Sequence, residues 1–303
     1  MNIVIFGYGY TGAKLYRELK NSNIYNVLGF ADNSVYKQGN KVGSYKIMSV
    51  DELVLLKRSI DFSIIIATGK WWYEIGEVLE KYDIPIEGVY QHGNIIEYSR
   101  MSFKKLDLTK NIKLYAGDIC HEKHKSEPYL YGLSISKADD KHIFHDITCP
   151  YPLPDNSIFS YQAEDVLEHI EYAKLKMVID EIYRILKVGG LFRISLPDYN
   201  SPYLKEICMK DKNGEIIFDP TGGGTFEAGR VINGGHVWFP NYKNVEELLR
   251  YTKFNKYSFL CYYTENEELI REKIDFSKGY IARLPEVYDS DKPVYSMVID
   301  CYK

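Results

Sequence analysis

Short apolar runs alternate along the first 90 residues with segments whose apolar side chains recur every three or four positions. The runs predict four buried strands, over residues 2–6, 26–32, 63–68 and 88–90. The segments between them predict three helices: 11–19, one that opens at Val50 with Ser49 as its cap, and 72–81. Strands that are apolar along almost their whole length and alternate with helices predict a parallel sheet with helices on both faces.

The same alternation resumes after a polar stretch around residues 90–110. Further strands are predicted over residues 112–117, 142–146, 157–165, 191–197, 257–263 and 294–302, and further helices over 172–186 and 245–254. We therefore expect an α/β fold made of two doubly wound, Rossmann-like domains. The smaller domain would span residues 1–95, a linker 96–110, and the larger domain 111–303.

The composition indicates which binding partners and which cellular compartment to expect. A formal net charge of −4 without a basic arm or stripe predicts no nucleic-acid partner, and no apolar stretch approaches the roughly 20 residues of a membrane span. The five cysteines are widely spaced and the N-terminus enters a strand directly, which together favour a cytoplasmic protein with reduced thiols. A homo-oligomer is compatible with these features. Four histidines close in sequence complete no ligand set, so no metal is predicted: His121, His124, His142 and His145.

Four motifs follow one another between residues 146 and 198. Asp146 ends a predicted strand, PLPDNSIF covers residues 152–159, EDVLEHI covers 164–170, and EIYRILKVGGLFRISLP covers 181–197. In this order and spacing they resemble the core of the class I S-adenosylmethionine (SAM)-dependent methyltransferases, in the branch with small-molecule acceptors. The resemblance implies SAM as the cofactor and residues 111–303 as the domain that binds it.

The same resemblance implies five cofactor-binding residues: Gly117, Asp118, Asp146, Glu164 and Asp165. SAM would lie over Gly117, in a loop that needs glycine because its backbone approaches the ligand closely, with the adenine near Asp146. The loop lacks the second glycine that is usual in the family, and Ser134 stands where an acid usually holds the ribose. These departures leave open a binding or scaffold protein whose methyltransferase-like domain is not catalytic.

Two histidines are candidates for the catalytic group. Methyl transfer from a sulfonium depends mainly on alignment, and an oxygen or nitrogen acceptor can need a base or a hydrogen-bond acceptor to orient it. His169 lies at the carboxyl edge of the predicted sheet, and His236 lies in a glycine-rich stretch, residues 221–242, that is typical of a lid over an acceptor. Trp238 is expected to face the ligand beside His236. Alternatively, His169 packs against the following helix and the lid is a loop with no role.

A G-x-G-x-x-G motif follows the first predicted strand. Gly7, Gly9 and Gly12 form it, and Asp32 ends the second predicted strand. With the segments around them they resemble the small Rossmann-like module at the N-terminus of sugar acyltransferases and other polysaccharide-biosynthesis enzymes. The resemblance implies a nucleotide or nucleotide-sugar ligand, with Asp32 on the ribose hydroxyls. The sequence Asp32-Asn33-Ser34 is also a favourable turn, so a module without a ligand stays open.

These observations lead to one leading hypothesis and two alternatives. The chain is expected to be a SAM-dependent methyltransferase with a small-molecule acceptor, a sugar or surface-glycan precursor, and the sugar rests only on the N-terminal resemblance. The first alternative is a non-catalytic binding or scaffold protein. The second is an NAD-linked oxidoreductase that uses the N-terminal glycines, an interpretation that leaves most of the chain without a role.

Overall fold

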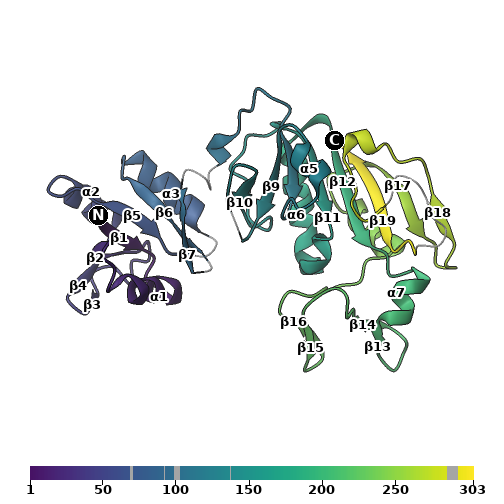
Figure 1. Ribbon diagram of the computed structural model, residues 1–303, viewed down its shortest axis with the longest axis horizontal. Coiled ribbons are helices and arrows are strands. Elements are labelled where there is room, and N and C mark those ends of the chain that lie inside the picture. The colour runs from purple at the N-terminus through teal and green to yellow at the C-terminus, as the bar shows by residue number, and fades with distance from the viewer. Residues whose placement is uncertain (69–70, 92, 99–102, 137, 285–292) are drawn as a thin grey trace. The chain divides into compact units, whose positions relative to one another are not determined.

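The computed structural model describes residues 1–303 except 69–70, 92, 99–102, 137 and 285–292 (Figure 1). The described chain divides into two compact units: unit 1 comprises Met1–Lys105 with Ile135–Phe144, and unit 2 comprises Leu106–Ser134 with His145–Lys303. Both units contain parallel strands and helices, so the predicted α/β class is confirmed. Within the described residues, no helix combines the length and the apolar character needed to cross a membrane.

Unit 1 is built on a seven-stranded sheet with the order β3-β4-β2-β1-β5-β6-β7. Its strands are β1 (Asn2–Phe6), β2 (Asn26–Ala31), β3 (Lys41–Val42), β4 (Tyr45–Met48), β5 (Ser63–Ile66), β6 (Ile86–Gln91) and β7 (Asn94–Glu97). Its helices are α1 (Tyr10–Leu19), α2 (Val50–Lys57) and α3 (Trp72–Lys81). Strand β1 pairs in parallel with β2 and β5, and β4 and β6 extend the parallel set on either side. The apolar sequence of β1 is almost wholly buried, as a central parallel strand requires.

Local signals in the sequence fix several element ends in unit 1. The helix predicted over 72–81 is confirmed as α3, and α2 begins with a capping box in which Ser49 and Glu52 each accept a hydrogen bond from the other's backbone N–H. The prediction that strand structure ends at residue 90 is wrong, because β6 turns back into the antiparallel strand β7. An edge strand with two apolar residues between polar ones carries too little pattern to distinguish it from a linker.

Unit 2 is built on a sheet whose strands have the order β9-β8-β11-β12-β19-β17-β18. These strands are β8 (Lys113–Ala116), β9 (Leu130–Ser134), β11 (Ile158–Glu164), β12 (Leu186–Pro197), β17 (Lys256–Tyr263), β18 (Leu269–Arg271) and β19 (Ser296–Tyr302). Strand β10 (His142–Phe144) falls within the residues of unit 1. Strand β8 pairs in parallel with β9 and β11, and β11 pairs in parallel with β12. Strand β19 runs antiparallel between β12 and β17.

Helices and short hairpins complete unit 2. The α-helices are α5 (Glu122–Ser126), α6 (Tyr172–Ile185), α7 (Pro202–Ile207) and α8 (Tyr242–Arg250). The one-turn 3₁₀ helices η2 (Leu167–His169) and η3 (Phe276–Lys278) also lie in unit 2, and a further one, η1 (Phe103–Lys105), lies in unit 1. Two hairpins lie between α7 and α8: β13 (Met209–Lys210) with β14 (Ile216–Phe218), and β15 (Thr225–Glu227) with β16 (Arg230–Ile232). The segment predicted as a glycine-rich lid therefore contains the β15–β16 hairpin.

One face of the sheet in unit 2 is apolar. Phe192 of β12 lies between Tyr161 of β11 and Phe254, with ring centroids 5.5 and 5.7 Å away, and Tyr183 of α6 packs against Phe254. Helix α6 buries one stripe of aliphatic side chains: Leu175, Val178, Ile179, Ile182 and Ile185. The period of three and four residues that predicted this helix is therefore the period of its core contacts.

The opposite face carries buried polar side chains beside an apolar cluster that includes Val298 and Ile281. It differs from the first face because successive residues of a strand point to opposite sides. Arg193 follows Phe192 and is fully buried, and its guanidinium donates to both carboxylate oxygens of Asp300 at 2.7 and 2.8 Å. The same guanidinium donates to the carbonyl oxygens of Asp275 and Gly279. Residues 275–284, here called the cover segment, therefore close this face, and Tyr280 in it accepts a hydrogen bond from Gln162 of β11.

Candidate functional site

The carboxyl ends of β8 and β11 lie side by side because the two strands pair in parallel. Gly117 follows β8 with φ of 93°, a conformation that favours glycine, and among the described residues a side chain there would touch only Val166, at 3.5 Å. Asp165 follows β11 with φ of 52°, which costs a residue with a side chain about 1 kcal/mol or more. The strained residue directs the chain across the edge of the sheet into η2.

Glu168, His169 and His236 form a cluster beside this edge. One ligand atom from each lies within 4.8 Å of the others, the two imidazole centroids are 4.7 Å apart, and His236 Nε2 is 3.6 Å from Glu168 Oε1. Glu168 and His236 are buried, whereas His169 is exposed. The two histidines that the sequence offered as catalytic candidates are therefore neighbours, although 67 positions separate them in the sequence, 236 against 169.

Hydrogen bonds at Nδ1 fix the tautomer of both rings. His169 Nδ1 lies 2.8 Å from the carbonyl oxygen of Gly234, so Nδ1 donates a proton and Nε2 keeps its lone pair. His236 Nδ1 contacts the Tyr199 hydroxyl, whose own proton goes to Asp219 Oδ2 at 2.7 Å, so His236 also donates from Nδ1. A carboxylate behind a histidine fixes its tautomer in this way at many metal and catalytic sites.

The ionisation of the groups around the histidines follows from burial and hydrogen bonding. Burial lowers the pKa of His169. Burial by itself raises the pKa of Asp219, but hydrogen bonds from His236, Thr221 and Tyr199 outweigh it and bring that pKa below its usual range. Asp219 is therefore a stable carboxylate, suited to hold the proton on Nδ1 of His236.

Glu168 is the least satisfied polar side chain of the cluster. It is 0% exposed, and among the described residues neither of its carboxylate oxygens has a hydrogen-bond partner. Burial, with the nearby charge of Asp165 as a further cause, raises its pKa well above the usual value. A buried carboxylate without donors is costly, so this side chain is either protonated or paired with a cation.

The turn that carries Glu168 is held by the segment after the β15–β16 hairpin. The N–H of Val237 donates to the Glu168 carbonyl at 2.9 Å, and Trp238 Nε1 donates to the Leu167 carbonyl at 2.9 Å. The expectation that Trp238 faces a ligand is wrong, because its ring is buried and packs against Tyr172 with centroids 5.2 Å apart. Trp238 instead positions η2 and thereby the cluster.

The two acids at the end of β11 contact the cover segment. The N–H of Arg283 donates to Glu164 Oε1 at 2.9 Å, and Arg283 Nε lies 2.5 Å from Asp165 Oδ2. Burial raises the pKa of Glu164 to about 7, which the backbone hydrogen bond from Arg283 only partly offsets. Burial also raises the pKa of Asp165, against the pull of the Arg283 charge. Asp165 also lies within electrostatic reach of His169 and His236.

The other predicted cofactor residues lie in loops at the ends of β8 and β10. Gly117 and Asp118 are half-buried after β8. Asp146, also half-buried, follows β10, and its Oδ1 accepts from Thr148 N–H at 2.9 Å and from the Thr148 hydroxyl at 2.6 Å. This carboxylate therefore stabilises its own turn in addition to any role toward a ligand.

The N-terminal glycines divide into two kinds. Gly7, with φ of 100°, and Gly9 line a cavity of about 440 Å³ together with Asp32. A Cβ added at Gly9 would meet no heavy atom within 4 Å among the described residues, so this backbone is open to a ligand. Gly12 lies outside the lining, and a Cβ there would come within 1.9 Å of the Gly7 carbonyl oxygen. Gly12 is therefore required for packing α1 against the loop.

Asp32 is positioned by three donors in its own unit. Its Oδ2 accepts from Tyr8 N–H and from Lys37 Nζ, and its Oδ1 accepts from Ser34 N–H, each at 2.9 Å. Burial alone would raise its pKa, but these hydrogen bonds outweigh burial and lower it. The carboxylate is ionised and fixed, and its remaining lone pairs can still accept from ribose hydroxyls.

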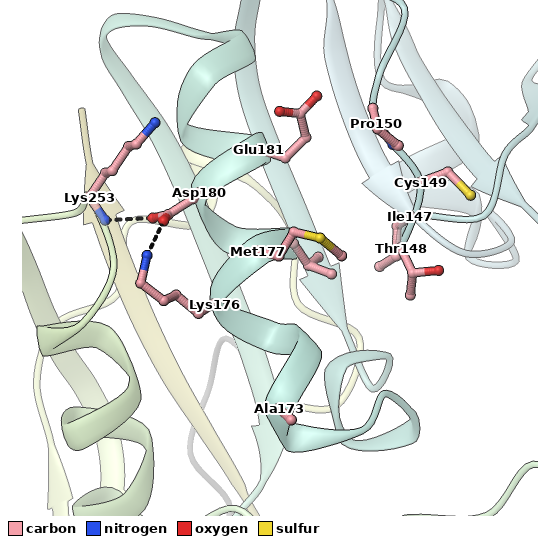
Figure 2. Close-up of a pocket in the computed structure, with 11 residues that line it drawn as sticks. Ile147, Thr148, Cys149, Pro150, Ala173, Lys176, Met177, Asp180, Glu181 and Lys253 are labelled. Carbon is pink, nitrogen blue, oxygen red and sulfur yellow. Dashed lines mark hydrogen bonds and ion pairs between the residues drawn. The ribbon is translucent and has the colours of Figure 1, made fainter. Parts of the chain in front are cut away.

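A further cavity, of about 450 Å³, lies between α6 and residues 147–150 (Figure 2). Its carboxylate at Asp180 is already paired: Lys176 forms an ion pair with it, and the backbone N–H of Lys253 donates to it at 2.7 Å. None of the residues predicted from the sequence as site residues lines it. We therefore place the candidate site at the edge of β8 and β11.

Sequence reasoning missed three residues that shape this site: Glu168, Tyr199 and Asp219. Glu168 precedes His169 in the EDVLEHI motif, and an acid next to a candidate histidine is a signal that could have singled it out. Tyr199 and Asp219 meet His236 only through the fold, and their local sequence carries no such signal.

Comparison with known proteins gives distant structural similarity. No protein-family model matches the chain, and no curated protein matches it. A SAM-dependent methyltransferase from Archaeoglobus fulgidus is similar at 16% identity, over 64% of this chain and 86% of that one, with a TM-score of 0.40. The 1,6-didemethyltoxoflavin-N1-methyltransferase of Burkholderia thailandensis is similar at 9% identity, over 65% and 72%, with a TM-score of 0.38. UDP-D-quinovosamine 4-dehydrogenase from Vibrio fischeri is similar at 19% identity, over 34% and 94%, with a TM-score of 0.28.

Proposed function

We propose that this chain is a SAM-dependent methyltransferase with a small-molecule acceptor. The observation that carries the proposal is a group of ionisable side chains at the carboxyl edge of β8 and β11: Glu164, Asp165, Glu168, His169 and His236. Ligands of open parallel sheets bind at this edge. The motifs of residues 146–198, which resemble the methyltransferase core, supply the identity of the cofactor.

In this proposal SAM lies over Gly117 and Asp118, with its adenine near Asp146. The methionine part of SAM carries an ammonium, a carboxylate and a sulfonium. The acids at the end of β11 would attract the two cationic groups, and the half-exposed guanidinium of Arg283 is suited to the carboxylate. Because the sulfonium is already activated, the main task of the protein is to align it with the acceptor.

The acceptor is proposed to enter beside the β15–β16 hairpin and to meet the histidine cluster. His236 presents Nε2 to Glu168, His169 keeps the lone pair on its Nε2, and the hydrogen bonds at Nδ1 hold each ring in place. Either Nε2 can accept a proton from a hydroxyl or orient it. A positioned base of this kind contributes about 10²- to 10⁴-fold to the rate.

The acceptor class is proposed to be a sugar or a surface-glycan precursor. Its support is the N-terminal unit, where Gly9 and Asp32 line a cavity suited to a nucleotide or nucleotide-sugar. The phosphates would lie against the open backbone at Gly9 and the ribose against Asp32. This part of the proposal rests on the resemblance of unit 1 to modules of polysaccharide-biosynthesis enzymes.

The test is formation of S-adenosylhomocysteine from SAM by the purified chain, measured by chromatography with a panel of sugars and nucleotide-sugars. We expect product that depends on one class of acceptor and is retained in His121→Ala, a variant of an exposed histidine outside the cluster. Absence of acceptor-dependent product across sugars, small amines and phenols, from protein that binds SAM, would overturn the catalytic assignment.

A non-catalytic binding protein is the second candidate, and the cover segment favours it. The Tyr280 carbonyl accepts a hydrogen bond from Gln162 of β11, and the Arg283 N–H donates one to Glu164. The cover segment therefore fills part of the face on which a ligand would bind. In this candidate unit 2 is a scaffold and unit 1 holds the ligand. Binding of a nucleotide-sugar or NADH by protein that binds neither SAM nor S-adenosylhomocysteine would support it.

A further inference from the structure

We propose that Glu168, His169 and His236 bind a divalent first-row transition-metal ion, of the Zn²⁺ or Mn²⁺ type. No metal is predicted from the sequence, because the histidines that lie close along the chain complete no ligand set: His121, His124, His142 and His145. The fold instead brings together two other histidines, one from η2 and one from the segment after the β15–β16 hairpin.

The geometry leaves room for an ion between the three side chains. Two metal–ligand bonds of about 2.0–2.2 Å hold their donor atoms roughly 3–4 Å apart. His236 Nε2 and Glu168 Oε1 are already 3.6 Å apart, and one ligand atom from each of the three residues lies within 4.8 Å of the others. The ligand atoms need to move by about one ångström to reach this spacing, and the exposed side chain of His169 can make most of that movement.

The hydrogen bonds inside the cluster also point to a cation. His236 donates from Nδ1 toward Tyr199, so its Nε2 lone pair faces the Glu168 carboxylate. Two acceptors facing each other repel, and 3.6 Å is too long for a hydrogen bond that a shared proton would make. An ion bound to both atoms resolves this arrangement, and it supplies the partner that the fully buried Glu168 lacks among the described residues.

The surrounding charges favour a positive ion. The carboxylates of Asp165 and Asp219 lie within electrostatic reach of Glu168, and so does the guanidinium of Arg283, which is itself paired with Asp165. Outer hydrogen bonds from Nδ1 to Gly234 and Tyr199 hold both imidazoles as metal sites require. Two nitrogens and one carboxylate suit Zn²⁺, Mn²⁺ or Fe²⁺, whereas Ca²⁺ and Mg²⁺ prefer oxygen ligands.

Three protein ligands leave coordination positions open. If the proposed methyltransferase function holds, on which this one step rests, an acceptor hydroxyl would occupy such a position and lose its proton more readily. The proposed acceptor class then narrows to molecules with an oxygen that can bind a metal. Binding of the ion itself needs neither SAM nor an acceptor.

The test is calorimetric titration of the chelator-treated full chain with Zn²⁺ alone, Mn²⁺ alone and Ca²⁺ alone. We expect one transition-metal ion per chain and no saturable Ca²⁺ binding. Glu168→Gln and His169→Ala should each weaken the metal affinity at least tenfold. Matched controls at exposed positions outside the cluster, Glu171→Gln and His121→Ala, should keep it within about twofold.

Absence of saturable binding of either transition metal, or equal affinity in wild type, Glu168→Gln and His169→Ala, would overturn the proposal, as would equal loss in the controls. Should Glu168→Gln not fold by circular dichroism, His169→Ala decides alone, because that imidazole is exposed. Titration of the same preparations with SAM separates the two proposals. Metal binding without SAM binding would contradict the proposed function, and SAM binding without metal binding would contradict only the proposed metal site.

Discussion

The carboxyl edges of β1 and β8 both begin with a glycine at positive φ, Gly7 and Gly117, but the side chains around them differ. In unit 1 a single acid, Asp32, is satisfied by three donors and stands beside open backbone at Gly9. In unit 2 several acids and two imidazoles crowd the edge, and Glu168 is buried without a hydrogen-bond partner among the described residues.

Under the proposed function, this difference separates a site that binds a ligand from a site that catalyses a reaction on one. Satisfied, fixed groups around open backbone suit recognition of phosphate and ribose. Buried groups with displaced pKa values suit proton transfer or metal binding, because their free energy changes when charge moves beside them. We therefore propose that unit 2 carries out methyl transfer and that unit 1 only binds a ligand.

The largest effect is expected from His236→Ala in unit 2. Loss of the buried imidazole should lower methyl-transfer turnover by about 10²- to 10⁴-fold, while SAM affinity changes by no more than about twofold. Steady-state rates and SAM titration of the same preparation measure both quantities, with His121→Ala as the control. Loss of SAM affinity with turnover preserved at saturating SAM would show that His236 belongs to the cofactor site.

Arg193→Met should cost unit 2 about 3–5 kcal/mol of unfolding free energy, because it leaves the Asp300 carboxylate buried and unpaired. The exposed pair of Arg250 with Glu246 is the control, and Arg250→Met should cost less than about 1 kcal/mol. Urea unfolding followed by circular dichroism measures both. Equal and small losses of unfolding free energy in the two variants would mean that the Arg193–Asp300 pair does not stabilise this face of the sheet.

Gly12→Ala and Gly9→Ala separate packing from recognition in unit 1. The added methyl at Gly12 meets the Gly7 carbonyl and should destabilise unit 1 by about 1–3 kcal/mol. The methyl at Gly9 meets no described atom, so stability should change by less than about 0.5 kcal/mol while nucleotide or nucleotide-sugar affinity falls. Thermal unfolding and ligand titration measure the two effects. Unchanged ligand affinity in Gly9→Ala would show that the ligand does not bind at this loop.

The smallest effect is expected from Asp146→Ala, which should weaken SAM binding about tenfold, or about 1.4 kcal/mol. Asp107 is a matched control, since its Oδ1 accepts from the N–H and hydroxyl of Thr109 as Asp146 does from Thr148. Asp107→Ala removes the same kind of turn before β8 and should leave SAM affinity unchanged. Equal affinity losses in the two variants would assign Asp146 to turn stability alone.

The sequence predicted the local parts of this fold well, since local parts follow from neighbouring residues. The apolar runs gave the central strands, and the Ser49 capping box and helix 72–81 lie where the pattern placed them. Strand β7 was missed because an edge strand of four residues has little period to detect. The Arg193–Asp300 pair joins residues 107 positions apart, and in the sequence Arg193 is only a charge inside an apolar strand.

The two histidines of the candidate site were predictable, but Glu168 and the arrangement of the cluster were not. The EDVLEHI motif and the glycine-rich segment pointed to His169 and His236 separately. Their contact, and the burial of Glu168, arise because Val237 and Trp238 bond to the backbone of η2. Such long-range hydrogen bonds are set by tertiary packing, and no spacing in the sequence encodes them.

The central claim is that unit 2 binds SAM, and calorimetric titration of the purified full chain with SAM and S-adenosylhomocysteine tests it most directly. NADH and a nucleotide-sugar are titrated alongside. We predict micromolar binding of SAM or S-adenosylhomocysteine at one site per chain, with the same affinity in Gly9→Ala. Binding of NADH or a nucleotide-sugar together with no binding of either sulfur compound would contradict the claim and leave unit 2 as a scaffold.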